Sequence, residues 1–136
     1  MKRAILLLPL IWPTVGLPAY LNGNTLLDRC KGNVTEQPYC IGYLTGIADL
    51  SFTEGWAMLR VARSGIEEIK NPERKANTRK EINNTLKDYA CIPSNVPVGQ
   101  LRLVFVRWAT AHRGQLHGPA DDLAKKAFRE TWPCKF

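Results

Sequence analysis

Residues 101–112, LRLVFVRWATAH, carry the clearest pattern in the sequence and decide its fold class. Apolar or aromatic side chains recur there three and four positions apart, at Leu101, Val104, Phe105, Trp108 and His112. This spacing places them on one face of an α-helix, because the helix has 3.6 residues per turn. No stretch of useful length alternates apolar and polar residues as a half-buried strand does. The sequence therefore predicts an all-α domain.

A last helix is predicted after the turn that closes this one. Gly114 and Gly118 bracket the turn, and Pro119 suits the first position of a helix because the missing N–H needs no partner there. Asp121 and Asp122 then fall in the first turn, where the helix dipole favours acidic side chains. The apolar face of this helix consists of Leu123, Ala127 and Phe128. We expect the two helices to lie antiparallel.

N-terminal to residues 101–112, prolines separate this helix from the helix predicted before it. Pro93 and Pro97 mark a turn region. Before it, Asn71-Pro72-Glu73 has the order of a cap, a first-turn proline and a favourable acidic residue, which predicts the start of a helix. This is the weakest predicted helix, because its main apolar positions are only Ile82, Leu86 and Tyr89.

The N-terminal half of the domain adds two or three helices. A short helix is predicted behind the cap-like Asn24-Thr25, and residues 31–38 form a loop. Ser51 and Glu54 have the S-x-x-E spacing of a capping box, which predicts a second helix or a bent continuation as far as Lys70. The apolar faces are Leu26, Leu27 and Cys30, then Cys40, Tyr43, Leu44 and Ile47, then Leu59, Ala62, Ile66 and Ile69. The prediction is a small bundle of about five helices.

Two glycines, Gly42 and Gly46, lie four positions apart inside one of these helices. Each costs up to about 1 kcal/mol of helix propensity relative to alanine. Close approach of a second backbone would explain them, and tolerated glycines on the helix surface are the alternative.

The first 19 residues have the pattern of a secretory signal peptide. A basic start, Met1-Lys2-Arg3, precedes an apolar run that is too short to span a bilayer. Cleavage is expected after Ala19, with cleavage after Gly16 as the alternative, and a buried N-terminal segment is the competing interpretation. The remaining residues 20–136 have the length and composition of one globular domain, since 45% of the chain is hydrophobic and 23% is charged. The net charge of +7 permits an anionic partner without requiring one.

Four cysteines in a small exported chain are most simply two disulfides with no free thiol. Antiparallel terminal helices would bring Cys91 close to Cys134, and Cys30 and Cys40 flank the loop between the first two helices. These are the preferred pairs, although four cysteines allow three pairings. A zinc site is disfavoured because the chain has no CxxC pair and its two histidines are five positions apart. Paired cysteines would also not act as nucleophiles.

A basic run lies on the weakest predicted helix and consists of Arg74, Lys75, Arg79, Lys80 and Lys87. A solvated helix face is the favoured interpretation, and a binding surface is the alternative. A nucleic-acid interface is disfavoured, because no aromatic residues are interleaved to stack on bases.

Several short motifs recur in a fixed order near both ends of the domain. They are Leu26-Leu27-x-x-Cys30, Cys40-x-Gly42-Tyr43-x-x-Gly46-x-x-Asp49, Cys91-x-Pro93, Gly99-Gln100-Leu101, His112, His117-x-Pro119-Ala120 and Pro133-Cys134. In this order and spacing the chain closely resembles the Tai-type family of type VI secretion immunity proteins. The resemblance covers residues 24–50 and 91–134, whereas residues 51–90 match much less well and are more basic.

The resemblance implies a function by inhibition. Members of that family are exported to the periplasm, form small helical domains that commonly dimerise, and neutralise peptidoglycan amidase toxins by covering their active sites. It implies a cognate amidase toxin as partner and no cofactor. The residues themselves agree, because they offer no nucleophile with a base, no carboxylate pair and no metal set. A small periplasmic chaperone or envelope-stress protein is the alternative.

Candidate partner-binding residues are the five cations of the basic run, from Arg74 to Lys87, and His117. His117 precedes a predicted helix start, so a local capping role is favoured over contact with a partner. Asp49 is predicted to lie near a helix end, where the dipole is unfavourable to an acid, and we expect it to have a backbone amide or an arginine as partner.

Overall fold

The computed structural model describes residues 20–136, and every described element is helical. The five α-helices are α1 (Gly23–Lys31), α2 (Gln37–Glu67), α3 (Pro72–Leu86), α4 (Val98–Ala111) and α5 (Ala120–Thr131), with a 3₁₀ turn at Arg113–Gln115. Within residues 20–136 the only β pairings are two isolated bridges, Asn22 with Pro119 and Ala90 with Pro133. The prediction of an all-α domain of about five helices is confirmed. The predicted signal peptide lies outside the described residues.

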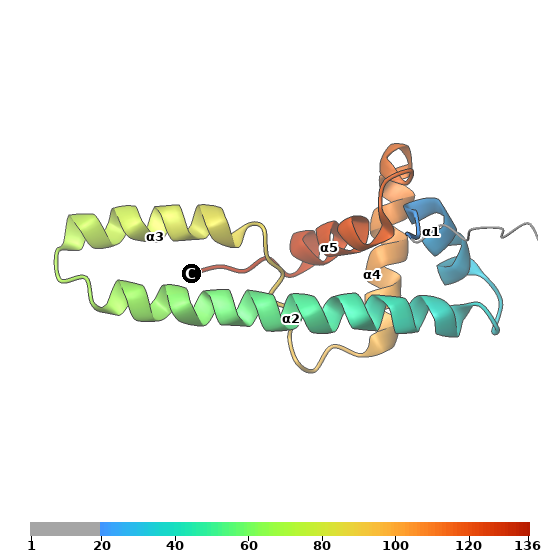
Figure 1. The fold of residues 1–136 in the computed structure, drawn as a ribbon, viewed down its shortest axis with the longest axis horizontal. Coiled ribbons are helices and arrows are strands. Elements are labelled where there is room, and N and C mark those ends of the chain that lie inside the picture. The colour runs from blue at the N-terminus through green and yellow to red at the C-terminus, as the bar shows by residue number, and fades with distance from the viewer. Residues whose placement is uncertain (1–19) are drawn as a thin grey trace, which may run out of the picture.

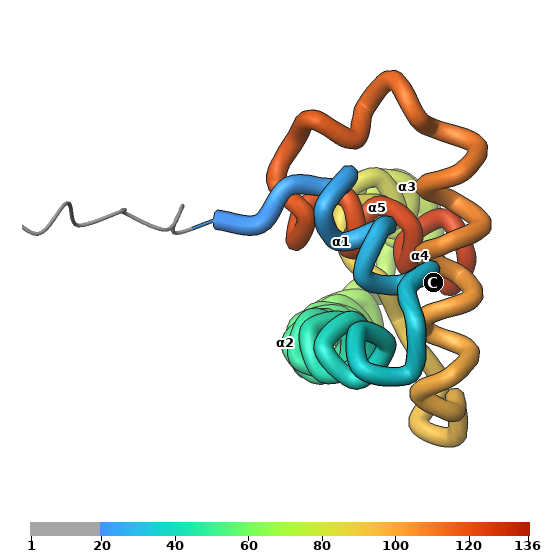
Figure 2. The backbone as a smooth tube through the Cα atoms, turned by 90° about the vertical axis from the view of Figure 1, so that its right-hand side faces the viewer, coloured from blue at the N-terminus to red at the C-terminus, as the bar shows by residue number. Residues whose placement is uncertain are grey.

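α2 joins two parts of the molecule (Figure 1). It has 31 residues without a break, which corresponds to about 46 Å at 1.5 Å per residue. Its N-terminal half packs with α1, α4 and α5 to form what we call the body. Its C-terminal half pairs with α3 to form a helical hairpin, which we call the arm. The view along α2 shows that α4 crosses it steeply instead of running beside it (Figure 2).

The core of the body is built from the apolar faces that the sequence predicted. Its largest fully buried side chains are Leu26, Leu44, Phe105, Leu116 and Phe128. Removing such side chains from water is the main favourable contribution to folding, about 25 cal/mol for each Å² of apolar surface. The body therefore holds most of the stabilising burial of the domain.

The arm has a separate and smaller core. Leu59 and Leu86 are buried there with Cys134, and Met58, Ile82, Tyr89, Cys91 and Phe136 pack against them. The C-terminal residues cover one side of the arm, because the Phe136 backbone N–H donates to Asn83 Oδ1 at 3.0 Å and the Arg79 guanidinium lies 5.3 Å from the Phe136 ring centroid. The arm thus depends on α2, α3 and the end of the chain together.

Both preferred disulfides are present. Cys30 pairs with Cys40 and Cys91 pairs with Cys134, and no described cysteine is free. Because all four thiols are consumed in these bonds, they cannot hold zinc or act as nucleophiles. Cys91–Cys134 ties the root of the arm to the C-terminal residues, and Cys30–Cys40 ties α1 to the start of α2.

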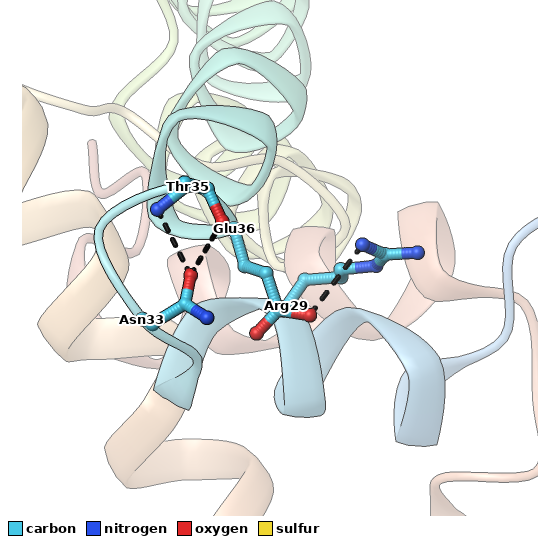
Figure 3. Close-up of polar contacts among 4 residues, drawn as sticks. All are labelled: Arg29, Asn33, Thr35 and Glu36. Carbon is cyan, nitrogen blue, oxygen red and sulfur yellow. Dashed lines mark hydrogen bonds and ion pairs between the residues drawn. The ribbon is translucent and has the colours of Figure 1, made fainter.

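The α1–α2 loop is also fixed by polar contacts (Figure 3). Asn33 Oδ1 accepts hydrogen bonds from the Thr35 backbone N–H at 2.9 Å and from the Thr35 hydroxyl at 2.6 Å. Arg29 and Glu36 form an ion pair at 3.6 Å across the loop. These contacts and the Cys30–Cys40 disulfide hold the beginning of α2 against α1.

Of the two alternatives predicted from Ser51 onward, a second helix and a bent continuation, the second helix is wrong, because α2 continues without a break to Glu67. Ser51 and Glu54 lie inside the continuous helix, and Ser51 is buried. A capping box stabilises only a real helix start, and here the buried stripe continues through Leu59 to Ile66, so packing keeps the helix whole. Asp49 consequently lies in mid-helix and is exposed to solvent. Its backbone carbonyl accepts from the Thr53 hydroxyl at 3.0 Å, but its carboxylate has no ion-pair or hydrogen-bond partner among the described residues, so the expected backbone amide or arginine is not observed.

The other helix starts follow the sequence with small shifts. Asn71 caps α3 as predicted, because its Oδ1 accepts from the Arg74 N–H at 3.0 Å. α1 is capped by Asn22, two residues before the predicted Asn24, and Asn22 Oδ1 accepts from the Thr25 N–H at 2.9 Å. Pro119 is the N-cap of α5 and not its first residue. α2 begins at Gln37, so the last two residues of the predicted loop 31–38 are helical.

The glycine that permits close packing is not one of the predicted pair. A Cβ built on Gly42 or Gly46 would meet nothing within 4 Å, so both are surface glycines, as the alternative interpretation held. Close approach occurs at Gly55, where the Ala90 carbonyl and Cys134 Sγ lie against the helix. Both glycines lie on the surface of the single chain, so the homodimer that the family resemblance implies stays a prediction.

Candidate partner-binding surfaces

The predicted basic run lies on the arm, but its members do not form one patch. Lys80 and Lys87 are exposed and seven positions apart, so they share a face of α3, because each residue turns the helix by about 100°. Arg74 is exposed on another face, and Lys75 is half-buried. Arg79 is turned towards Phe136. The run is a dispersed set of charges on a solvated helix.

His117 lies in a different part of the molecule. It is exposed in the turn between the 3₁₀ helix and α5, on the body (Figure 1). No side chain caps α5, so the predicted capping role of His117 is wrong. Backbone groups hold this turn instead, since the Ala120 N–H donates to the Leu21 carbonyl at 2.8 Å and the Gly23 N–H donates to the Gly118 carbonyl at 3.0 Å. The structure does not bring His117 together with the basic run.

A surface that the sequence analysis missed runs along α2. Asp49, Phe52, Trp56 and Arg60 are three, four and four positions apart, so they share one helix face, and we call them the α2 strip. Phe52 and Trp56 are each 38% exposed, and their ring centroids are 6.2 Å apart. Their spacing was the available signal, because it defines a second face of a helix whose first face is buried core.

An apolar groove lies beside the α2 strip, between α2, residues 92–98 and the start of α4. Its volume is about 250 Å³. Asp49 and Phe52 form part of its edge, and Val98, half of whose surface is exposed, lies on the opposite wall. The other lining residues are Thr45, Ala48, Ile92, Pro93, Ser94, Val96 and Leu101. We call it the strip groove.

Two further grooves lie elsewhere. One of about 430 Å³ follows the arm between α2 and α3, with Met58, Val61 and Ile82 among its lining residues and Glu81 as its only charged one. The other, also about 430 Å³, lies between α4 and α5 beside Trp108 and His112. The His112 ring stacks on Trp108 at 4.3 Å, and its Nδ1 is 2.8 Å from the Trp108 carbonyl oxygen. His112 is therefore a structural residue at the end of α4.

The Tyr43 phenol in the body is perturbed by its surroundings. Burial between α2 and α5 raises the pKa of the Tyr43 phenol, and the Asp121 carboxylate raises it further. The phenol stays neutral over the physiological range.

In residues 20–136, no three histidine, cysteine or carboxylate side chains are grouped closely enough to hold a metal ion. No described helix is both long and apolar enough to cross a membrane.

Comparison with known proteins gives one match. A family model described as Rap1a immunity proteins matches residues 22–134, which include all five helices and both disulfides. No curated protein and no solved structure matches the chain.

Proposed function

Because the chain belongs to the Rap1a immunity protein family, we propose that it is a periplasmic immunity protein that binds a type VI secretion peptidoglycan amidase and blocks its active site. The observation that carries the proposal is the family match over residues 22–134. Immunity to a toxin follows from the family. The amidase target and the Tai type follow from the resemblance of the motifs around the four cysteines.

Two features support export to the periplasm. Disulfides persist in oxidising compartments and are rare where thiols are kept reduced, and this domain contains two of them. The sequence before residue 20 has the basic start and short apolar run of a signal peptide. Both features support a location in the periplasm, where an amidase would attack the cell wall.

We propose that inhibition occurs by occupation of the toxin and not by chemistry. The four thiols are bonded, and the charged side chains of the arm are exposed to solvent, apart from the half-buried Lys75. The arm projects from the body and coincides with most of residues 51–90, the part that departs from the immunity-protein motifs (Figure 1). Residues that only maintain the scaffold cannot distinguish one toxin from another, so we assign part of the specificity to the arm.

Charge reversal on α3 tests the role of the basic run. We expect Arg74→Glu, Lys80→Glu and Lys87→Glu together to slow association with the amidase about tenfold at low ionic strength, because exposed charges act mainly on the encounter rate. The difference should shrink as salt is added. Thermal stability should change little, since all three side chains are exposed. Surface plasmon resonance at two salt concentrations measures the effect.

A matched control tests whether the position of the reversed charges matters or only the change in net charge. Lys31, Arg107 and Arg113 are also exposed and lie on the body, so reversing them changes the net charge equally. Equal slowing by both triple variants would show that only net charge matters and would remove the basic run from the interface.

The function itself is tested in cells. We expect the full chain to protect a susceptible bacterium against its cognate periplasmic amidase, and the purified proteins to form a complex without amidase activity. A version without residues 2–19 should not protect, because it would stay in the cytoplasm. Loss of viability despite normal amounts of the full chain would refute the proposal and favour the periplasmic chaperone. His117→Ala in the same assay tests whether that exposed side chain contacts the toxin.

A further inference from the structure

We infer that the α2 strip and the strip groove are the main contact with the toxin, and that they take a toxin segment carrying an apolar side chain between a cation and a carboxylate. The inference rests on the proposed function, because it specifies the partner of the same protein. It differs from the assignment of the arm, since it places the tightest contacts where α2 passes over residues 92–98.

The side chains of the strip are those that dominate protein interfaces. Tryptophan and arginine are enriched among residues that lose the most binding energy when truncated, and such residues lie next to pockets. Trp56 and Arg60 lie one turn apart on α2, and Phe52 forms the edge of the groove. The groove offers space of about 250 Å³ beside these rings, enough for a large apolar side chain.

The charges of the strip give the partner an orientation. Asp49 lies at one end and Arg60 at the other, about 16 Å apart along the helix axis for eleven residues. Both are exposed, and neither forms an ion pair in the part of the chain that the structure describes. Asp49 lines the groove, whereas Arg60 lies outside it, beyond Trp56 on the same face of α2, so the two free charges fit a segment that places a cation at the groove and a carboxylate about three turns further along the helix.

The groove is held in its open shape before any partner binds. Trp56 Nε1 donates to the Ile92 carbonyl at 3.2 Å, so the ring is fixed to the opposite wall. Pro93 and Pro97 restrict that wall, the Val96 N–H donates to the Pro93 carbonyl at 3.2 Å, and the neighbouring Cys91 is bonded to Cys134. A surface that does not need to be ordered on binding loses less entropy in the complex.

The other grooves lack this combination. The arm groove has no aromatic side chain and a charge of one sign only, at Glu81. In the groove between α4 and α5, the Trp108 Nε1 is buried away from solvent and has no hydrogen-bond partner among the described residues. A ligand in that groove could not reach the N–H without displacing the ring.

The test uses the full mature chain and the amidase identified by the protection assay. We expect Asp49→Lys and Arg60→Glu each to weaken the complex at least tenfold, mainly through faster dissociation, because truncating or reversing a desolvated charge acts on the dissociation rate. The double variant Asp49→Lys/Arg60→Glu keeps the net charge and reverses the order of charges, so it should bind at least as weakly as either single variant. Asp28→Lys, an equally exposed change on α1, is the control and should bind normally.

The outcomes separate this inference from the proposed function. A wild-type protein that protects and binds while both strip variants also bind normally would overturn the strip and leave the immunity function intact. A wild-type protein that neither binds nor protects would overturn both. Light scattering of the free proteins tests whether a second copy of the chain occupies the strip instead of the toxin. If Asp49→Lys converts a dimer into a monomer, the strip faces a second copy and the inference is wrong. Circular dichroism melts confirm that each variant is folded.

Discussion

Gly55→Ala should destabilise the protein by about 3 kcal/mol, whereas Gly46→Ala in the same helix should stabilise it by up to about 1 kcal/mol. A Cβ at Gly55 would fall inside contact distance of the Ala90 carbonyl oxygen, 3.0 Å from its carbon and 3.1 Å from Cys134 Sγ. Backbone and disulfide atoms cannot move aside as the end of a flexible side chain can. At Gly46 the added methyl meets nothing within 4 Å, so only the gain in helix propensity remains.

Urea unfolding followed by circular dichroism measures both changes. The pair is matched, because the substitution, the helix and the measurement are the same and only the surroundings differ. Gly42→Ala serves as a second open position and should behave like Gly46→Ala. If Gly55→Ala unfolds at the same urea concentration as the wild type, the close approach of residue 90 to α2 is wrong.

Replacing Cys91 and Cys134 together by alanine should cost about 4 kcal/mol, because the disulfide closes a chain segment with a sequence separation of 43 residues. The same change at Cys30 and Cys40 should cost about 3 kcal/mol, since that separation is only 10 residues. The two losses of stability should also affect different parts of the protein. Cys91–Cys134 joins the root of the arm to the C-terminal residues, and the arm has only a small core of its own.

Limited proteolysis with intact mass measurement locates these effects. In the Cys91→Ala/Cys134→Ala variant we expect early cleavage in the arm, within residues 58–90, while the body stays protected. In the Cys30→Ala/Cys40→Ala variant the arm should be cut no faster than in the wild type. Cleavage of body and arm at equal rates in the first variant would show that the arm does not open on its own.

The fold was predictable where one periodic signal was strong. The stripe from Leu101 to Trp108 was sufficient for α4, and the cysteine positions favoured the two observed disulfides among three possible pairings. The order of motifs indicated an immunity protein family, which the match to Rap1a immunity proteins confirms, whereas the Tai type stays a prediction. The break at Ser51 was mispredicted because a capping box is a local signal, and burial of Ser51 and Leu59 on one continuous face outweighs it.

The candidate site was less accessible to sequence reasoning. A helical stripe shows which residues share a face but not whether another element covers that face. From the sequence alone, Phe52 and Trp56 could have belonged to the core. In the structure, residues 92–98 lie so that both side chains stay partly exposed, with a groove beside Phe52. In the same way, the sequence around Gly55 does not show that the distant residue Ala90 packs against it. Both features arise from contacts between distant parts of the chain.

The uninterrupted α2 has a consequence for how such proteins diverge. One face of this helix carries the core residues Leu44, Ala48 and Leu59, and another carries Phe52 and Trp56. Because 3.6 residues per turn keep the two faces apart, substitutions at the exposed positions Asp49 and Arg60 leave the packed face unchanged. A single continuous helix can therefore acquire substitutions on one face that suit a new toxin, while the same domain continues to fold.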